Sequence, residues 1–238
     1  MTFVLLLAGL TAIRPLRRAG RGGARDLFAG LGFIRRSPVF LAAITLDLFA
    51  VLFGGAVALL PIFAKDVLEV GPTGLGMLRA APALGALVTA LIVARGVTWA
   101  RPGLLLLLVV AGFGLATIGF GLSRNIVLSL ACLFLTGAFD SISMVIRDTL
   151  AQMITPDHLR GRVAAVEHTF VGFSNELGAF ESGATAALFG PIVSVVGGGI
   201  GTIVVVLVVA LAWPALARIG PLHTLAPAEE PEPVPARS

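Results

Sequence analysis

Six long runs of apolar residues follow one another along the chain. They cover residues 38–63, 72–95, 103–122, 126–147, 163–189 and 191–216. Because a helix rises about 1.5 Å per residue, roughly 20 apolar residues cross the hydrocarbon core of a bilayer, about 30 Å thick. The pattern therefore predicts an all-α membrane protein, in which a six-transmembrane-helix bundle occupies residues 38–216.

A shorter apolar run, residues 2–13, precedes these six. Its length corresponds to about 18 Å of helix, which is too short to cross a membrane alone. The nearby charged residues follow this run, whereas a secretory signal peptide carries its charges in front. We interpret residues 1–13 as the end of a transmembrane helix whose beginning lies outside this sequence.

The composition agrees with a membrane location. The chain is 57% hydrophobic and 13% charged, with a mean hydropathy of +1.00, whereas soluble domains carry about 25% charged residues. These values exclude a soluble globular domain, and Cys132, the only cysteine, excludes a disulfide scaffold. The net charge of +4 comes from basic residues between apolar runs, which indicates membrane orientation and no nucleic-acid partner.

The distribution of basic residues predicts the orientation. If residues 14–36 are cytoplasmic, six crossings place 95–102, 147–162 and the tail from 217 on the same side. Fourteen of the Lys and Arg residues are then cytoplasmic, and only Lys65, Arg79 and Arg124 lie outside. This asymmetry follows the positive-inside rule. We therefore expect both termini to be cytoplasmic.

Two segments flank the bundle. Residues 14–37 form a basic cytoplasmic loop, in which 24–36 place apolar residues on one helical face and arginines on the other. This segment is either an amphipathic helix at the membrane surface or a solvated basic linker. Residues 217–238 form a cytoplasmic tail that is rich in proline and acidic residues, and we expect its end to be disordered.

Several polar side chains lie inside the predicted spans. A carboxylate within a bilayer costs at least about 2.5–3.5 kcal/mol and normally faces a bundle interior or a wet cavity. Helical rise places Asp47, Asp140, Asn175 and Glu176 near mid-depth, and Glu181 lies nearer the outer end of its span. We interpret these five as a polar cavity for substrate or coupling protons. Alternatively, individual acids are paired or protonated within packing contacts, and Glu181 is an interfacial side chain.

A second cluster of charges lies at the predicted cytoplasmic edge. It consists of Arg147 and Asp148 at the end of one span, Arg160 and Arg162 in the connection, and Glu167 at the start of the next. One interpretation is a cytoplasmic gate, in which Arg–carboxylate pairs close one state and break in the other. The alternative is that these residues are ordinary topology anchors at helix ends.

The sequence contains no pattern typical of a catalytic or metal site. The glycine-rich run at 197–201 has no preceding strand and no following Lys-Ser or Lys-Thr, so it indicates helix packing and not phosphate binding. The histidines, at 158, 168 and 223, are scattered. We therefore expect that the protein binds no cofactor and no metal, and that it is not an enzyme.

The stretch 147–183 carries a family resemblance. Its motifs PDHLRGRV at 156–163, NELG at 175–178 and FESG at 180–183, with FIRRSPVF at 33–40, resemble the major facilitator superfamily. Within it, they are most similar to the enterobactin-exporter-like efflux branch.

The resemblance implies that the chain is the C-terminal six-helix half of a twelve-helix transporter in the cell membrane. In that family the seventh, eighth, tenth and eleventh helices line the cavity and the ninth and twelfth lie outside. The two spans without an ionisable residue, 103–122 and 191–216, coincide with the ninth and twelfth.

The implied function is secondary, proton-coupled efflux of small amphipathic molecules, such as siderophores or drugs, by alternating access. The partner would be the N-terminal six-helix half, either in a longer chain or as a second subunit. The loop 94–102 departs from the family pattern, because it lacks the acidic residue and the closing basic cluster. The alternative function is a non-transporting membrane scaffold or partner subunit.

Overall fold

The computed structural model describes residues 34, 37–96, 99–157, 159–218 and 220. Every regular element in this part of the chain is helical, which confirms the predicted all-α class. In chain order, these elements are α3 (Pro38–Phe53), the 3₁₀ helix η1 (Gly55–Leu59), α4 (Leu60–Ile62), the π-helical turn η2 (Phe63–Val67), α5 (Gly71–Val93), α6 (Pro102–Leu122), α7 (Ile126–Ile154), α8 (Arg160–Phe189), α9 (Pro191–Ala212) and α10 (Pro214–Ala217).

Five helical segments among the described residues are long and apolar enough to cross a membrane: Pro38–Val67, Gly71–Val93, Pro102–Leu122, Ile126–Ile154 and Pro191–Ala212. The sixth predicted span lies within α8, which is 30 residues long but carries more charged side chains than the other five. That α8 crosses the membrane remains a prediction. The predictions for residues 1–13, for the amphipathic segment up to Arg36 apart from Ile34, and for the end of the tail fall outside the described residues.

Local sequence signals explain several helix boundaries. Proline occupies the first turn of α3, α6 and α9, where its missing N–H costs no helical hydrogen bond. Asn125 caps α7, because its side-chain oxygen accepts a hydrogen bond of 2.8 Å from the backbone N–H two residues on. Gly190, with φ of 89°, provides the turn between α8 and α9.

The first predicted span is interrupted. α3 ends at Phe53, and the chain continues through 3₁₀, α and π-helical turns to Val67. The break falls at Gly54 and Gly55, where a side chain on Gly55 would collide with Ser182 of α8. The apolar pattern over 38–63 did not predict this interruption, because hydrophobicity is the same on both sides of it.

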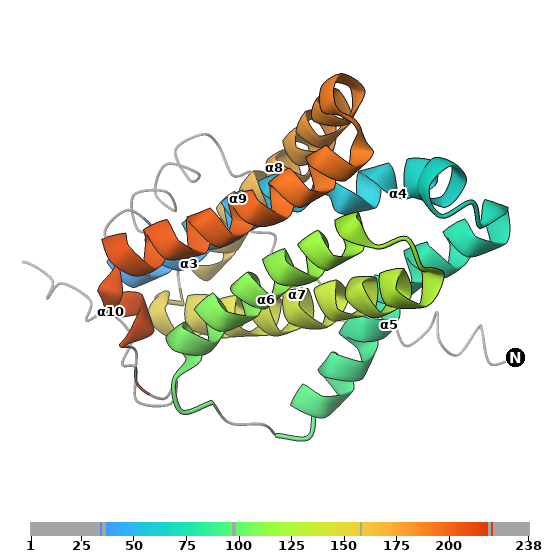
Figure 1. Ribbon diagram of the computed structural model, residues 1–238. Helices are drawn as coiled ribbons and strands as arrows, with labels where there is room; N and C mark the ends of the chain where they lie inside the picture. The colour runs from blue at the N-terminus through green and yellow to red at the C-terminus, as the bar shows by residue number, and fades with distance from the viewer. Residues whose placement is uncertain (1–33, 35–36, 97–98, 158, 219, 221–238) are drawn as a thin grey trace, which may run out of the picture.

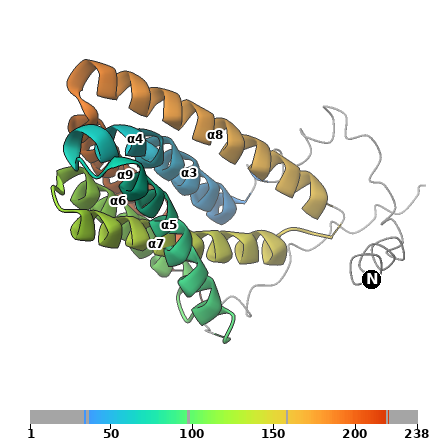
Figure 2. The ribbon, with the colours of Figure 1, turned by 90° about the vertical axis from the view of Figure 1, so that its right-hand side faces the viewer.

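The helices pack in closely apposed pairs (Figures 1 and 2). α5 packs against α7, α6 lies between α7 and α9, and α3 contacts both α8 and α9. Gly85 of α5 and Gly137 of α7 allow one close approach, because a β-carbon on either would collide with a backbone carbonyl of the opposite helix. Such small-residue contacts are typical of helix association in membranes.

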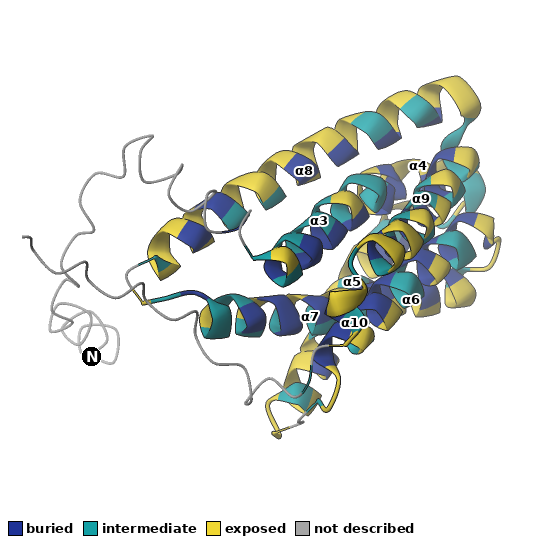
Figure 3. Cartoon of the chain, turned by 90° about the vertical axis from the view of Figure 1, so that its left-hand side faces the viewer, coloured by how far each residue is buried: buried dark blue, intermediate teal, exposed yellow. Residues whose placement is uncertain are grey.

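One cluster of the hydrophobic core lies where α3, α6, α7 and α9 meet. Leu46, Leu106, Ile146 and Leu150 are fully buried there. On the opposite side of α6, Leu104, Leu108, Leu115 and Leu122 form an exposed apolar stripe. α8 lies at the edge of the bundle, and its outward side is exposed along its length (Figure 3).

Candidate functional site

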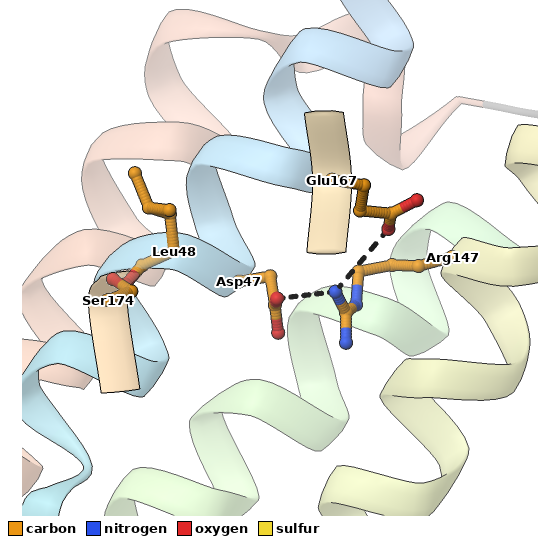
Figure 4. Close-up of polar contacts among 5 residues, drawn as sticks. All are labelled: Asp47, Leu48, Arg147, Glu167 and Ser174. Carbon is orange, nitrogen blue, oxygen red and sulfur yellow. Dashed lines mark hydrogen bonds and ion pairs between the residues drawn. The ribbon is translucent and has the colours of Figure 1, made fainter. Parts of the chain in front are cut away.

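A buried ion network joins three helices (Figure 4). Arg147 of α7 forms an ion pair through Nη1 with Oδ2 of Asp47 on α3. The same Nη1 lies 3.8 Å from Oε1 of Glu167 on α8. The three side chains are 8%, 5% and 12% exposed, respectively. Two carboxylates thus share one guanidinium in the interior of the bundle.

The network lies at one depth in the bundle. Asp47 is nine residues into α3, Arg147 is seven residues before the end of α7, and Glu167 is seven residues into α8. Helical rise places them about 10–13 Å from these helix ends. All three ends are predicted to be cytoplasmic, so the network lies two to three turns inside that face.

The charges in the network do not balance. One cation faces two acids, and Nε of Arg147 is buried without a hydrogen-bond partner among the described residues. Buried pairs are strongly destabilised when one partner is lost. Arg147 can therefore be held by Asp47 or by Glu167, and the charge state of either acid changes which contact is favoured.

α8 is held against α3 by small residues, and this contact positions Glu167. Ser174 Oγ donates a hydrogen bond of 2.7 Å to the carbonyl oxygen of Leu48 (Figure 4). One turn further on, a β-carbon at Gly178 would lie 2.7 Å from the carbonyl oxygen of Leu52. The two backbones are therefore close enough that a larger side chain would separate them.

A small chamber adjoins the network between α3, α6 and α7. It has a volume of about 20 Å³, which is room for about one water molecule. Asp47, Asp140 and Ser143 are its polar lining residues, and Phe113 and Phe139 are among the apolar ones. The structure thus brings two of the predicted cavity acids to one space.

A larger pocket of about 260 Å³ lies between the end of α7 and the start of α8. Three of the predicted gate residues line it, namely Asp148, Arg160 and Glu167. Arg160 also forms an exposed ion pair of 3.0 Å with Asp157. Arg162 is exposed in the first turn of α8 and is not among the residues that line this pocket.

The remaining predicted cavity residues lie elsewhere on α8. Asn175 and Glu176 are exposed and line neither the chamber nor the larger pocket. Glu181 accepts a hydrogen bond of 3.0 Å from Thr185, one turn further along the helix. Within the described residues, the predicted ring of mid-depth groups is therefore divided between a buried chamber and an exposed helix face.

Sequence reasoning missed the pairing of Asp47 with Arg147, because it placed these residues in two separate clusters. Their similar distances from the same side of the membrane are a signal that could have joined them. It also missed Ser143 in the chamber and the hydrogen bond made by Ser174. No group of three or more His, Cys, Asp or Glu residues that could hold a metal ion occurs in the described part of the chain.

Comparison with known proteins places the chain among transporters. Residues 1–179 match the family model described as Major Facilitator Superfamily. The chain is 29% identical over 219 residues to the enterobactin exporter EntS of Escherichia coli O139:H28 (strain E24377A / ETEC) and of Shigella boydii serotype 18 (strain CDC 3083-94 / BS512). These alignments cover 91% of this chain and 52% of each exporter, so the chain spans about half the length of the curated relatives it matches.

Proposed function

Because the chain belongs to the major facilitator superfamily, we propose that it forms one six-helix half of a secondary transporter that exports small amphipathic molecules by alternating access. Family membership confirms the resemblance seen in residues 147–183 and favours a transporter over an enzyme. Together with the five apolar helices, it identifies a multi-pass membrane protein.

The direction and substrate class follow from the relatives. The similar proteins are named enterobactin exporters, which supports efflux and makes siderophores, or drugs of comparable amphipathic character, the first compounds to test. Since the chain spans about half of each relative, we include a second six-helix half in the proposal. It belongs to the same longer chain or to a separate subunit, and both termini of this half are cytoplasmic.

The observation that carries the proposal is the network of Asp47, Arg147 and Glu167. It links α3, α7 and α8 through one guanidinium. A proton that binds Asp47 removes the charge that holds Arg147 to α3, and Arg147 then remains held by Glu167 on α8. Loss of a proton from Asp47 restores the first contact. Proton binding thereby determines whether Arg147 joins α7 to α3 or only to α8. Alternating access requires such a change in the contacts between helices.

The chamber between Asp47 and Asp140 supports the same role. A space for one water molecule next to two carboxylates can pass a proton between them without exposing the network to bulk water. Asp148 and Glu167 line the larger pocket on the predicted cytoplasmic side. This pocket gives protons and water a route towards the network, in accord with a cytoplasmic gate.

The proposal is tested with Asp47→Asn in the complete transporter, reconstituted in proteoliposomes. We expect this variant to exchange substrate across the membrane at equilibrium. It should no longer accumulate substrate against a gradient when a pH difference is imposed. Asp157→Asn, which alters an exposed carboxylate 89% accessible to solvent, is the matched control and should accumulate substrate normally. Gradient-driven accumulation by Asp47→Asn would reject the coupling role. Absence of any transport by the unaltered protein would favour a scaffold.

A further inference from the structure

The outward face of α8 combines two exposed aromatic rings with a carboxylate. Phe173 and Phe180 are 67% and 73% exposed, and Glu176 is exposed between them. The helix packs on α3 through Ser174 and Gly178. Helical geometry places the three exposed side chains roughly opposite that contact, on the side that Figure 3 shows as exposed.

The spacing brings the three groups together. Glu176 is three residues after Phe173 and four before Phe180, so each ring lies about one turn from the carboxylate on the same face. Gly172 and Gly183 flank this set, and nothing lies within 4 Å of the position that a β-carbon would take on either. The surface beside these two glycines is therefore open on this half, and the two rings and the carboxylate between them are accessible.

Glu176 has no ion pair or hydrogen bond with any other residue that the structure describes, whereas Glu167 and Glu181 on the same helix both have partners. It lies 16 residues after the start of α8 and 13 before its end, which is near the middle of the predicted membrane crossing. A carboxylate at that depth faces a cavity or a cationic partner and not lipid. Among the described residues, no cation lies within ion-pair distance of Glu176.

We propose that Phe173, Glu176 and Phe180 form the recognition surface for the exported molecule, and that this molecule is a lipophilic organic cation. The carboxylate pairs with the positive charge, and the rings contact its apolar body and attract the cation through their π-faces. The inference rests on the proposed function, in which α8 lines the substrate path. It names the substrate class, which the family match alone leaves open.

Two probes of nearly identical size and shape but opposite charge test this inference. The complete transporter is purified in detergent, and binding of tetraphenylphosphonium and of tetraphenylborate is measured at equilibrium without any gradient. The cation should bind and the anion should not. Glu176→Gln should weaken cation binding about ten-fold, and Phe173→Leu or Phe180→Leu should each weaken it several-fold, since each removes one component of a charge-assisted contact.

The controls separate recognition from folding. Asp157→Asn changes an exposed carboxylate in the connection between α7 and α8 that pairs with Arg160, and it should leave binding unchanged. Glu176→Asp, which keeps the charge, should bind the cation within about three-fold of the unaltered protein. Equal binding of both probes overturns the inference. So does unaltered cation binding by Glu176→Gln, as expected if this carboxylate pairs with a basic residue of the second half.

The two proposals fail in different ways. Export of neutral or anionic compounds by a protein that does not bind tetraphenylphosphonium would reject the cation site and leave the transporter assignment intact. Glu176-dependent binding of the cation by a protein that exports no compound would support the recognition surface and reject proton-coupled efflux.

Discussion

Replacing Arg147 by methionine tests the buried network most directly. Methionine replaces the aliphatic part of the arginine side chain but lacks the guanidinium that Asp47 and Glu167 share. Arg147 and Asp47 are 8% and 5% exposed, so water screens their interaction weakly. Removing one partner from such a buried pair costs about 3–5 kcal/mol. At about 2–4 °C per kcal/mol for a chain of this size, the melting temperature should fall by roughly 6–20 °C.

The chain supplies its own reporter for this measurement. Cys132, its single cysteine, is 8% exposed in the packed bundle. In a detergent-solubilised transporter with no other cysteine, a thiol-reactive fluorophore labels this site only as the helices separate. A temperature ramp then gives the melting midpoint. Arg160→Met, which removes an arginine 51% exposed at the side chain, is the matched control and should shift the midpoint by less than about 3 °C.

A double substitution distinguishes the ion pair from general packing. Asp47→Asn removes the carboxylate charge that Arg147→Met leaves buried, so the two changes together should cost less than the sum of the single effects by at least about 1 kcal/mol. Additive losses would refute the interpretation of these residues as one network. A midpoint for Arg147→Met within about 2 °C of the unaltered protein would refute the magnitude derived from burial.

Three further predictions concern the scaffold, each measured by the same thermal assay. Gly178→Leu should lower stability by about 1–3 kcal/mol or more, because the side chain enters the contact with α3. At Gly183 nothing lies within 4 Å of the position that a β-carbon would take, so Gly183→Leu should change stability by under about 0.5 kcal/mol. Equal effects would contradict the packing argument. Asn125→Ala removes the cap of α7 and should cost about 0.5–2 kcal/mol, with Asn125→Ser retaining most of the stability. Arg160→Ala removes the exposed pair with Asp157 and a long hydrogen bond of 3.3 Å from Nε to the carbonyl oxygen of Thr155, and it should cost at most about 1 kcal/mol. A larger loss would indicate a structural role for these two contacts.

The apolar pattern located the helices well but not all their ends. The predicted span 103–122 corresponds to Pro102–Leu122, whereas the run 126–147 continues as a helix to Ile154. Hydrophobicity reports the part of a helix that lies in lipid, and a helix continues beyond it wherever its backbone hydrogen bonds remain satisfied. The run 191–216 ends earlier, at Ala212, because Pro214 cannot continue the hydrogen-bond pattern of the preceding turn.

Only part of the candidate site could be predicted from the sequence, and its ion pairing could not. A charged residue inside an apolar run is visible in the sequence and implies an interior position. Which acid meets Arg147 depends on how α3, α7 and α8 approach each other, and that depends on small residues such as Ser174 and Gly178. Asp47 and Arg147 are 100 positions apart in the chain, so no local pattern connects them.

Unlike the other long helices, α8 is too polar to be identified as membrane-spanning from its composition. Its polar residues follow from its role. One side of α8 binds α3 through small residues and carries Glu167 to the buried network. The other side presents Phe173, Glu176 and Phe180 outward. If a proton on Asp47 leaves Arg147 joined to Glu167 alone, α8 can move relative to α3 as the network changes. The same movement would displace Glu176 and its flanking rings, so coupling and substrate recognition would be linked through one rigid helix.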